Sequence, residues 1–233
     1  MKTSVNVASY YRNGTYPRKA QLVPMLKSVI RQADVVRLWL NEAPSVPDWI
    51  PDGVQVHISP ADLSDLGKFG FLKQDIEREI YLTCDDDIEY NGGYVSDMAN
   101  AVQSKQGIVS HHGRKLKAGQ RRYFNGSAET IVCLETNYKE VELDVPGTGV
   151  MAFDTDQINP HPILKSKDRG MVDLTFAVYA AEQKVPIYSL PHDECYFRYL
   201  NPPYEETLHW AAMKNQNRHI ALMQEIIRAK GIT

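Results

Sequence analysis

The stretch Ile80-Tyr81-Leu82-Thr83-Cys84-Asp85-Asp86-Asp87 decides the predicted fold, because an apolar run of strand length ends in three adjacent carboxylates. Carboxylates this close repel one another at neutral pH, and a divalent cation that prefers oxygen ligands relieves the repulsion. An acidic turn or a helix N-terminus is the simpler alternative, since Asp is common in both. The stretch predicts a metal and phosphate site at the end of a buried strand.

The segments around this stretch alternate between strand and helix patterns. Strands are predicted over 5–10, 35–40, 54–58 and 80–83, with helices over 21–32 and 69–79. Strands joined by helical crossovers form parallel sheets, and such sheets bind ligands beyond the carboxyl ends of their strands. The predicted fold class is α/β, a Rossmann-like, mostly parallel central sheet flanked by helices. Ser9-Tyr10-Tyr11 and the three aspartates lie at its ligand-binding edge.

The second half of the chain is less regular. Strands are predicted over 108–110, 130–134, 150–153 and 185–188, and helices over 171–183 and 205–230. No repeat and no low-complexity linker interrupts the chain, so we expect a single domain over residues 1–233.

The composition excludes several classes of protein. Of the 233 residues, 43% are hydrophobic and 24% charged, which is typical of globular proteins, and the net charge of −3 predicts no nucleic-acid partner. Three scattered cysteines indicate reduced thiols rather than a disulfide framework. Without a signal-like N-terminus or an apolar run of about 20 residues, we expect a cytoplasmic protein with no transmembrane segment.

Four motifs in fixed order resemble those of GT-A glycosyltransferases. Leu82–Tyr90, followed by Gly93-Tyr94-Val95, is similar to the D-x-D region of small bacterial and viral sugar transferases with a D-D-D-I-x-Y element. Asp65–Phe69 resembles their G-K-[FY] segment. Gly147–Met151 and Met171–Asp173 resemble their acceptor-side loop and the helix that carries their catalytic acidic residue. The likeness spans residues 4 to 200.

The resemblance implies a GT-A fold with a nucleotide-binding half over about 1–105 and an acceptor and catalytic half over about 106–233. The donor would be bound by the end of the first strand, a lysine and two aspartates: Ser9, Tyr10, Tyr11, Arg12, Lys68, Asp85 and Asp86. Mn²⁺ or Mg²⁺ would be held by Asp87 and Asp86 and completed by His192. The acceptor would meet Gly147, Thr148 and Gly149.

Asp173 would be the base that deprotonates the acceptor hydroxyl in an inverting reaction, with Asp168 as the second choice. Each role has a simpler alternative. Tyr10 and Tyr11 could be ordinary strand residues, Lys68 a solvated lysine, Asp173 a helix N-terminal charge, and His192 a structural histidine.

The densest basic run is Arg114, Lys115, Lys117, Arg121 and Arg122. It could be a mobile loop that closes on the diphosphate or contacts an anionic acceptor. A solvated loop is the simpler alternative. His111 and His112 precede this basic run. Because neighbours in a strand face opposite ways, these two histidines are poor candidates for chelating one metal together.

These observations predict a metal-dependent glycosyltransferase that moves a sugar from a UDP-sugar to a saccharide or glycan acceptor, peripheral to a membrane if the acceptor is lipid-linked. A sugar-phosphate nucleotidyltransferase is the first alternative. Such enzymes carry a glycine-rich loop after the first strand, and Ser9–Gly14 lacks that glycine density. A non-catalytic sugar- or metal-binding module is the second alternative, and it would not need a base such as Asp173.

Overall fold

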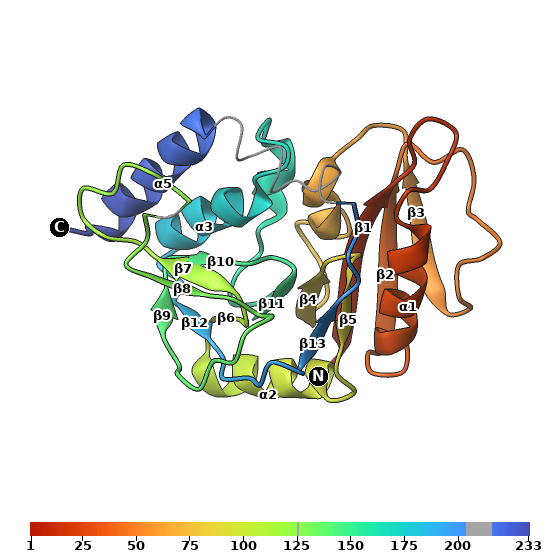
Figure 1. Cartoon of the computed structure of the whole chain (residues 1–233), viewed down its shortest axis with the longest axis horizontal. Helices are drawn as coiled ribbons and strands as arrows, with labels where there is room; N and C mark the ends of the chain where they lie inside the picture. The colour runs from red at the N-terminus through yellow and green to blue at the C-terminus, as the bar shows by residue number, and fades with distance from the viewer. Residues whose placement is uncertain (125, 204–215) are drawn as a thin grey trace.

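An eight-stranded sheet forms the centre of the computed structural model, which describes residues 1–124, 126–203 and 216–233 (Figure 1). Across the sheet the strands are β3 (Val54–Ser59), β2 (Val35–Asn41), β1 (Thr3–Tyr10), β4 (Ile80–Cys84), β11 (Val150–Asp154), β6 (Ile108–Ser110), β12 (Ile187–Ser189) and β9 (Glu142–Leu143). Four neighbouring pairs are parallel. Three are antiparallel, because β11 runs against β4 and β6, and β9 runs against β12. The predicted α/β class with a mostly parallel central sheet is confirmed.

Helices cover both faces of this sheet, and side chains alternate between them along each strand. On one face, α1 (Lys19–Val29) and α2 (Tyr94–Lys105) pack against Leu82 and Ala152. The other face carries the 3₁₀ helices η1 (Ser64–Phe69) and η2 (His161–Lys165) and the helix α3 (Val172–Glu182). There Tyr81 and Phe153 stack with ring centroids 5.3 Å apart. All five residues of β4 are buried, as a central strand requires.

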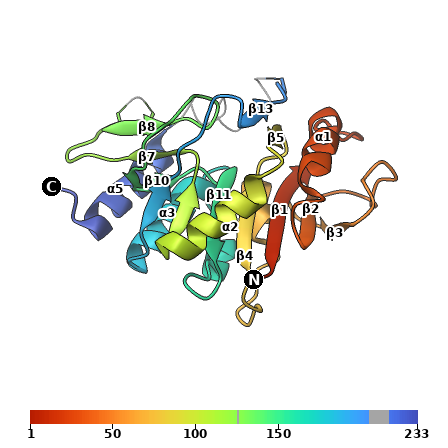
Figure 2. The same ribbon diagram turned by 90° about the horizontal axis from the view of Figure 1, so that it is seen from below.

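Two smaller sheets and a last helix complete the described chain. The helix α5 (Asn217–Lys230) packs on α3 through an apolar cluster that includes Leu222, Met223 and Ile226. A three-stranded sheet is formed by β10 (Val145–Pro146), β7 (Gly113–Lys115) and β8 (Glu129–Ile131), and a two-stranded one by β13 (Phe197–Tyr199) and β5 (Ile88–Tyr90). Figures 1 and 2 place α3 and α5 toward one end of the molecule, and α1, β2 and β3 toward the other.

The predicted helix over 69–79 is wrong, because residues 71–79 continue without helix into β4. Gly70 lies against the Trp39 ring so closely that a Cβ would come within 2.3 Å of it. Glu79 pairs with Arg37 at 2.6 Å, and Arg78 pairs with Asp154 at 2.6 Å. These tertiary contacts fix the two ends of the segment and outweigh its helical pattern.

One further predicted helix is seen in part, and one helix was not predicted. The helix predicted over 205–230 is present from Asn217 onward, and its earlier part, 205–215, lies outside the described residues. The helix α2 was not predicted. Among the described residues, no helix has the length and apolar character needed to cross a membrane.

Candidate functional site

The sheet topology brings three polar segments together at one edge. Strands β1 and β4 run parallel with Val7 opposite Cys84, so Ser9 and Asp86 follow at the same edge, and Ser9 Oγ donates to Asp86 Oδ2 at 2.6 Å. Strand β11 begins opposite the end of β4, which brings the loop Gly147–Gly149 to the aspartates. The Asp85 N–H donates to the Gly149 carbonyl at 3.2 Å. A cavity of about 490 Å³ opens between the aspartates and the loop Gly147–Gly149, and Ser9 lies beside it rather than in its lining.

The three aspartates have different partners, although they are adjacent in sequence. Asp85 forms an ion pair with Lys68, Asp86 accepts the Ser9 hydrogen bond, and Asp87 Oδ2 lies 3.9 Å from an Arg18 nitrogen. Burial raises the pKa of Asp86, and burial together with the charges of Asp85 and Asp86 raises the pKa of Asp87 to about 7. These carboxylates are therefore held where a bound cation would stabilise their charged forms.

The oxygen ligands of Asp86 and Asp87 suit Mg²⁺ or Mn²⁺, because Mg²⁺ is usually bound through one or two carboxylates plus substrate phosphates. Within residues 1–124, 126–203 and 216–233, no three His, Cys, Asp or Glu side chains converge on a common metal position. Phosphate oxygens of a substrate and water molecules are the usual remaining ligands of such a cation.

Arg18 is a site residue that the sequence analysis missed. It is buried at the N-cap position of α1, and it lines the cavity. Burial opposes its charge, but Asp86, Tyr10 and Asp87 together raise its pKa. The available signal was its position at the start of the first crossover helix, which in βαβ units faces the carboxyl edge of the sheet.

The 3₁₀ helix η1 connects both sides of the cavity through Asp65 and Lys68. Lys68 is buried, which opposes its charge, but the neighbouring Asp85 raises its pKa. Asp65 accepts hydrogen bonds from the N–H groups of Gly170 (2.9 Å) and Val172 (3.0 Å) at the start of α3. Burial raises the pKa of Asp65 to about 6. The role of Asp65 was not predicted, although its spacing of three from Lys68 places both side chains on neighbouring positions of one turn.

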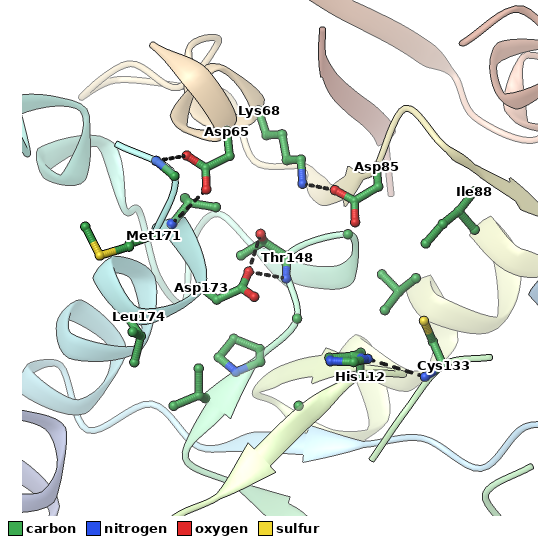
Figure 3. A pocket seen from close by; sticks show the side chains of 18 of the residues that line it. Asp65, Lys68, Asp85, Ile88, His112, Cys133, Thr148, Met171, Asp173 and Leu174 are labelled. Atoms are coloured by element: carbon green, nitrogen blue, oxygen red, sulfur yellow. Dashed lines mark hydrogen bonds and ion pairs between the residues drawn. The ribbon is translucent and has the colours of Figure 1, made fainter. Parts of the chain in front are cut away.

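Asp173 lies in the first turn of α3 and lines the same cavity as Asp85 (Figure 3). Its Oδ1 accepts hydrogen bonds from the Thr148 N–H (2.8 Å) and hydroxyl (2.6 Å). Among the described residues, its Oδ2 accepts no hydrogen bond. The loop Gly147–Gly149, predicted as the acceptor side, thus joins Asp173 to Asp85, and Gly149 leaves room for the Asp85 carboxylate.

His192 does not line the cavity. Its Nδ1 lies 3.2 Å from Nδ1 of His111 and 3.0 Å from the Leu190 carbonyl, so its ring is engaged in a buried histidine pair away from the aspartates. His112 faces the other way and lines the cavity, which agrees with the alternation expected for these neighbours. The structure gives the predicted metal role of His192 no geometric support.

The remaining donor-side candidates lie beside the cavity rather than in it. Tyr10 and Arg12 line a separate hollow, with the guanidinium 4.9 Å from the Tyr10 ring centroid. Tyr11 packs edge-on against Tyr16 at 4.9 Å. Asp168, the second choice of base, is hydrogen-bonded by Arg218 at 2.7 Å, which lowers its pKa. Asp173 is therefore the better placed of the two acids.

Comparison with known proteins supports the fold. No family model and no curated protein sequence matches the chain. The solved structure of 4-diphosphocytidyl-2C-methyl-D-erythritol synthase from Anaerococcus prevotii is similar with a TM-score of 0.52 and 11% sequence identity, over 93% of this chain and 96% of that chain. That structure is not a glycosyltransferase, so the predicted resemblance is supported only in part. The chain has the GT-A-like fold of nucleotide-diphospho-sugar transferases, with a mixed, mostly parallel sheet.

Proposed function

We propose that this chain is a metal-dependent glycosyltransferase that moves a sugar, with inversion, from a UDP-sugar to a hydroxyl of a saccharide or glycan acceptor. One observation carries the proposal. Asp173 and Asp85–Asp87 line a single cavity, and the loop Gly147–Gly149 contacts both. The side with Asp85–Asp87 suits a diphosphate with its cation. The side with Asp173 offers a carboxylate whose Oδ2 could accept a proton.

The proposed reaction uses Asp173 as the general base. The acceptor oxygen bonds to C1 of the donor sugar while the bond between C1 and the diphosphate oxygen breaks. The nucleoside diphosphate leaves with that electron pair, and the acceptor proton passes to the Asp173 carboxylate. The two hydrogen bonds from Thr148 fix Oδ1 and so orient the carboxylate for this transfer.

Arg18 and Lys68 bring buried positive charge to the leaving-group side. Both line the cavity and face the aspartates, where they would stabilise charge that develops on the diphosphate. Mn²⁺ or Mg²⁺ held by Asp86 and Asp87 would neutralise the same oxygens.

A sugar-phosphate nucleotidyltransferase is the second candidate, and the structural comparison favours it. The similar structure is named as an enzyme that makes a cytidine diphosphate ester of a methylerythritol. Two features of this chain argue for the first candidate instead. The segment Ser9–Gly14 after β1 contains one glycine where such enzymes carry a glycine-rich loop. A sugar phosphate also attacks through an oxygen that is already deprotonated, so it would leave Asp173 without a proton to take.

Substitution of Asp173 by Asn tests the proposal. The amide oxygen can still accept from Thr148, but it cannot act as a base, so we expect kcat for transfer to fall by about 10²- to 10⁴-fold with little change in donor KM. Asp168→Asn is the matched control and should keep kcat within about threefold of wild type, because Asp168 pairs with Arg218. Retention of the wild-type rate in Asp173→Asn would overturn the assignment of the base.

A further inference from the structure

The part of the cavity around Asp173 has a second wall that the proposed reaction does not use. It consists of Arg114 on β7, Tyr123 and Phe124 in the loop that follows, and His219 in the first turn of α5, and we name it the acceptor wall. Its three rings contact one another, with centroids 4.9 Å apart for Tyr123 and Phe124 and 5.7 Å from each of these to His219. Two parts of the chain that are far apart in sequence, 114–124 and the start of α5, thus build one continuous surface.

His219 carries a buried polar atom whose hydrogen bond is not satisfied within the described part of the chain. The residue is 8% exposed, and its Nδ1 is buried with no hydrogen-bond partner among the residues that the structure describes. Buried polar atoms are nearly always hydrogen-bonded in native proteins, so a bound group is expected to complete this one. Burial lowers the pKa of His219, and a neutral imidazole, with one donor and one acceptor nitrogen, suits a sugar hydroxyl.

Arg114 is the cation of the acceptor wall. Its Cζ lies 5.1 Å from the Tyr123 ring centroid and 5.5 Å from that of Phe124. Its Nη1 donates a hydrogen bond to the Thr130 hydroxyl at 3.2 Å. Arg18 and Lys68, the other cavity cations, lie within ion-pairing distance of aspartates, whereas Arg114 has no carboxylate within that distance in the described chain. The rings hold the guanidinium in place while it keeps donors for an oxyanion.

The surroundings of Arg114 favour the same kind of ligand. Lys115, Lys117, Arg121 and Arg122 are all exposed in the segment that carries the wall. Clustered charge of one sign attracts ligands of the opposite sign and raises their local concentration. The basic run is therefore a solvated surface except for Arg114, which reaches the cavity.

We propose that the acceptor wall binds an anionic saccharide. Arg114 binds a carboxylate or phosphate group of the acceptor, and His219 binds one of its hydroxyls, which presents a second hydroxyl to Asp173. This inference rests on the proposed glycosyltransferase function and adds the chemical class of the acceptor.

Three acceptors that differ in one group test the inference. A neutral oligosaccharide, its uronate counterpart and its phosphorylated counterpart are compared with the same UDP-sugar and Mn²⁺. We expect kcat/KM for at least one anionic acceptor to exceed that for the neutral one by about 10- to 100-fold, the effect of a charge-assisted hydrogen-bonded pair. The two anionic arms distinguish a carboxylate from a phosphate.

Arg114→Gln should reduce this preference to near one, and Arg114→Lys should keep part of it because the charge remains. Lys117→Gln, which removes an exposed charge from the same segment, is the matched control and should keep the preference. An equal loss for all three acceptors in Arg114→Gln would show a structural role and overturn the inference, as would a wild-type preference for the neutral acceptor.

Hydrolysis of the UDP-sugar without acceptor separates this inference from the proposed function. Donor turnover in the wild type combined with no anionic preference would overturn only the acceptor class. The absence of both hydrolysis and transfer with every nucleotide sugar would overturn the glycosyltransferase proposal, and the acceptor wall with it.

Discussion

Gly149→Ala is the substitution whose effect follows most directly from the geometry. A Cβ at this position would lie 1.9 Å from Oδ2 and 2.4 Å from Cγ of Asp85, whereas ordinary contact begins at 3.4 Å. The carboxylate must therefore withdraw by about 1.5 Å, which displaces it from the position in which it pairs with Lys68. A misplacement of about 1 Å can cost about 10²-fold in rate, equivalent to about 2.7 kcal/mol in the barrier.

Stability should change much less than rate in Gly149→Ala. The Asp85 side chain is 42% exposed and can swing into solvent, so the screened ion pair accounts for on the order of 1 kcal/mol. In a chain of this length such a change shifts the melting temperature by about 2–4 °C. Activity measured at 25 °C, well below the transition, therefore reports on the position of the carboxylate.

The assay is the initial rate of nucleoside diphosphate release from a UDP-sugar with Mn²⁺, measured beside the thermal midpoint. Gly92→Ala is the matched control, because a Cβ there meets no atom within 4 Å. A kcat/KM for Gly149→Ala within about threefold of wild type would show that the rate does not depend on the position of Asp85. An equal loss in Gly92→Ala would lead to the same conclusion.

Three other predictions follow from the site. Asp65→Asn leaves the two N–H groups of Gly170 and Val172, at the start of the helix that carries Asp173, with one amide oxygen as their acceptor. We therefore expect kcat to fall about tenfold. Donor affinity, measured by calorimetry with UDP and Mn²⁺, should be unchanged. The pKa of Asp65 is raised to about 6, so its contribution to stability is full below about pH 4 and is lost as the pH rises through 6. The free energy of unfolding of the wild type relative to Asp65→Asn should therefore fall between pH 4 and pH 6 in urea titrations, and a flat difference would contradict this assignment. His192→Gln should lower the melting temperature, because His192 pairs with His111 outside the cavity. The Mn²⁺ concentration needed for half-maximal activation should change by less than about twofold. A tenfold change would indicate that His192 is a metal ligand.

The parts of the fold that the sequence predicted well are those with local causes. The apolar run of β4 and the polar residues after it show in a single window, because a central strand is buried along its whole length while its end meets solvent. Asp173 could be proposed from its motif, and it does line the cavity with Asp85. Its role as a base stays a prediction.

The parts that were missed depend on partners far away in the sequence. Arg18 acquires its role from Asp86 and Asp87, nearly 70 residues later, and its position at the start of the first crossover helix was the only local signal. The end of the segment 71–79 is fixed by the ion pairs of Arg78 and Glu79 with residues of the sheet. Such contacts follow from strand order and register, which a single sequence does not give.

The acceptor wall shows the same limit more strongly. Arg114 and His219 are about 100 residues apart, and the packing of α5 on α3 brings His219 to the cavity. The basic run was visible in the sequence, but the one arginine in it that reaches the site was not distinguishable from its neighbours.

Identification of the leaving group distinguishes a glycosyltransferase from a nucleotidyltransferase. The protein is incubated with Mn²⁺ and either a UDP-sugar plus a saccharide acceptor or UTP plus a sugar phosphate, and the released products are resolved by ion-pair chromatography with mass detection. We expect one UDP for each sugar transferred in the first mixture and no pyrophosphate in the second. Release of pyrophosphate, together with formation of a nucleotide sugar, would contradict the glycosyltransferase proposal and establish the nucleotidyltransferase in its place.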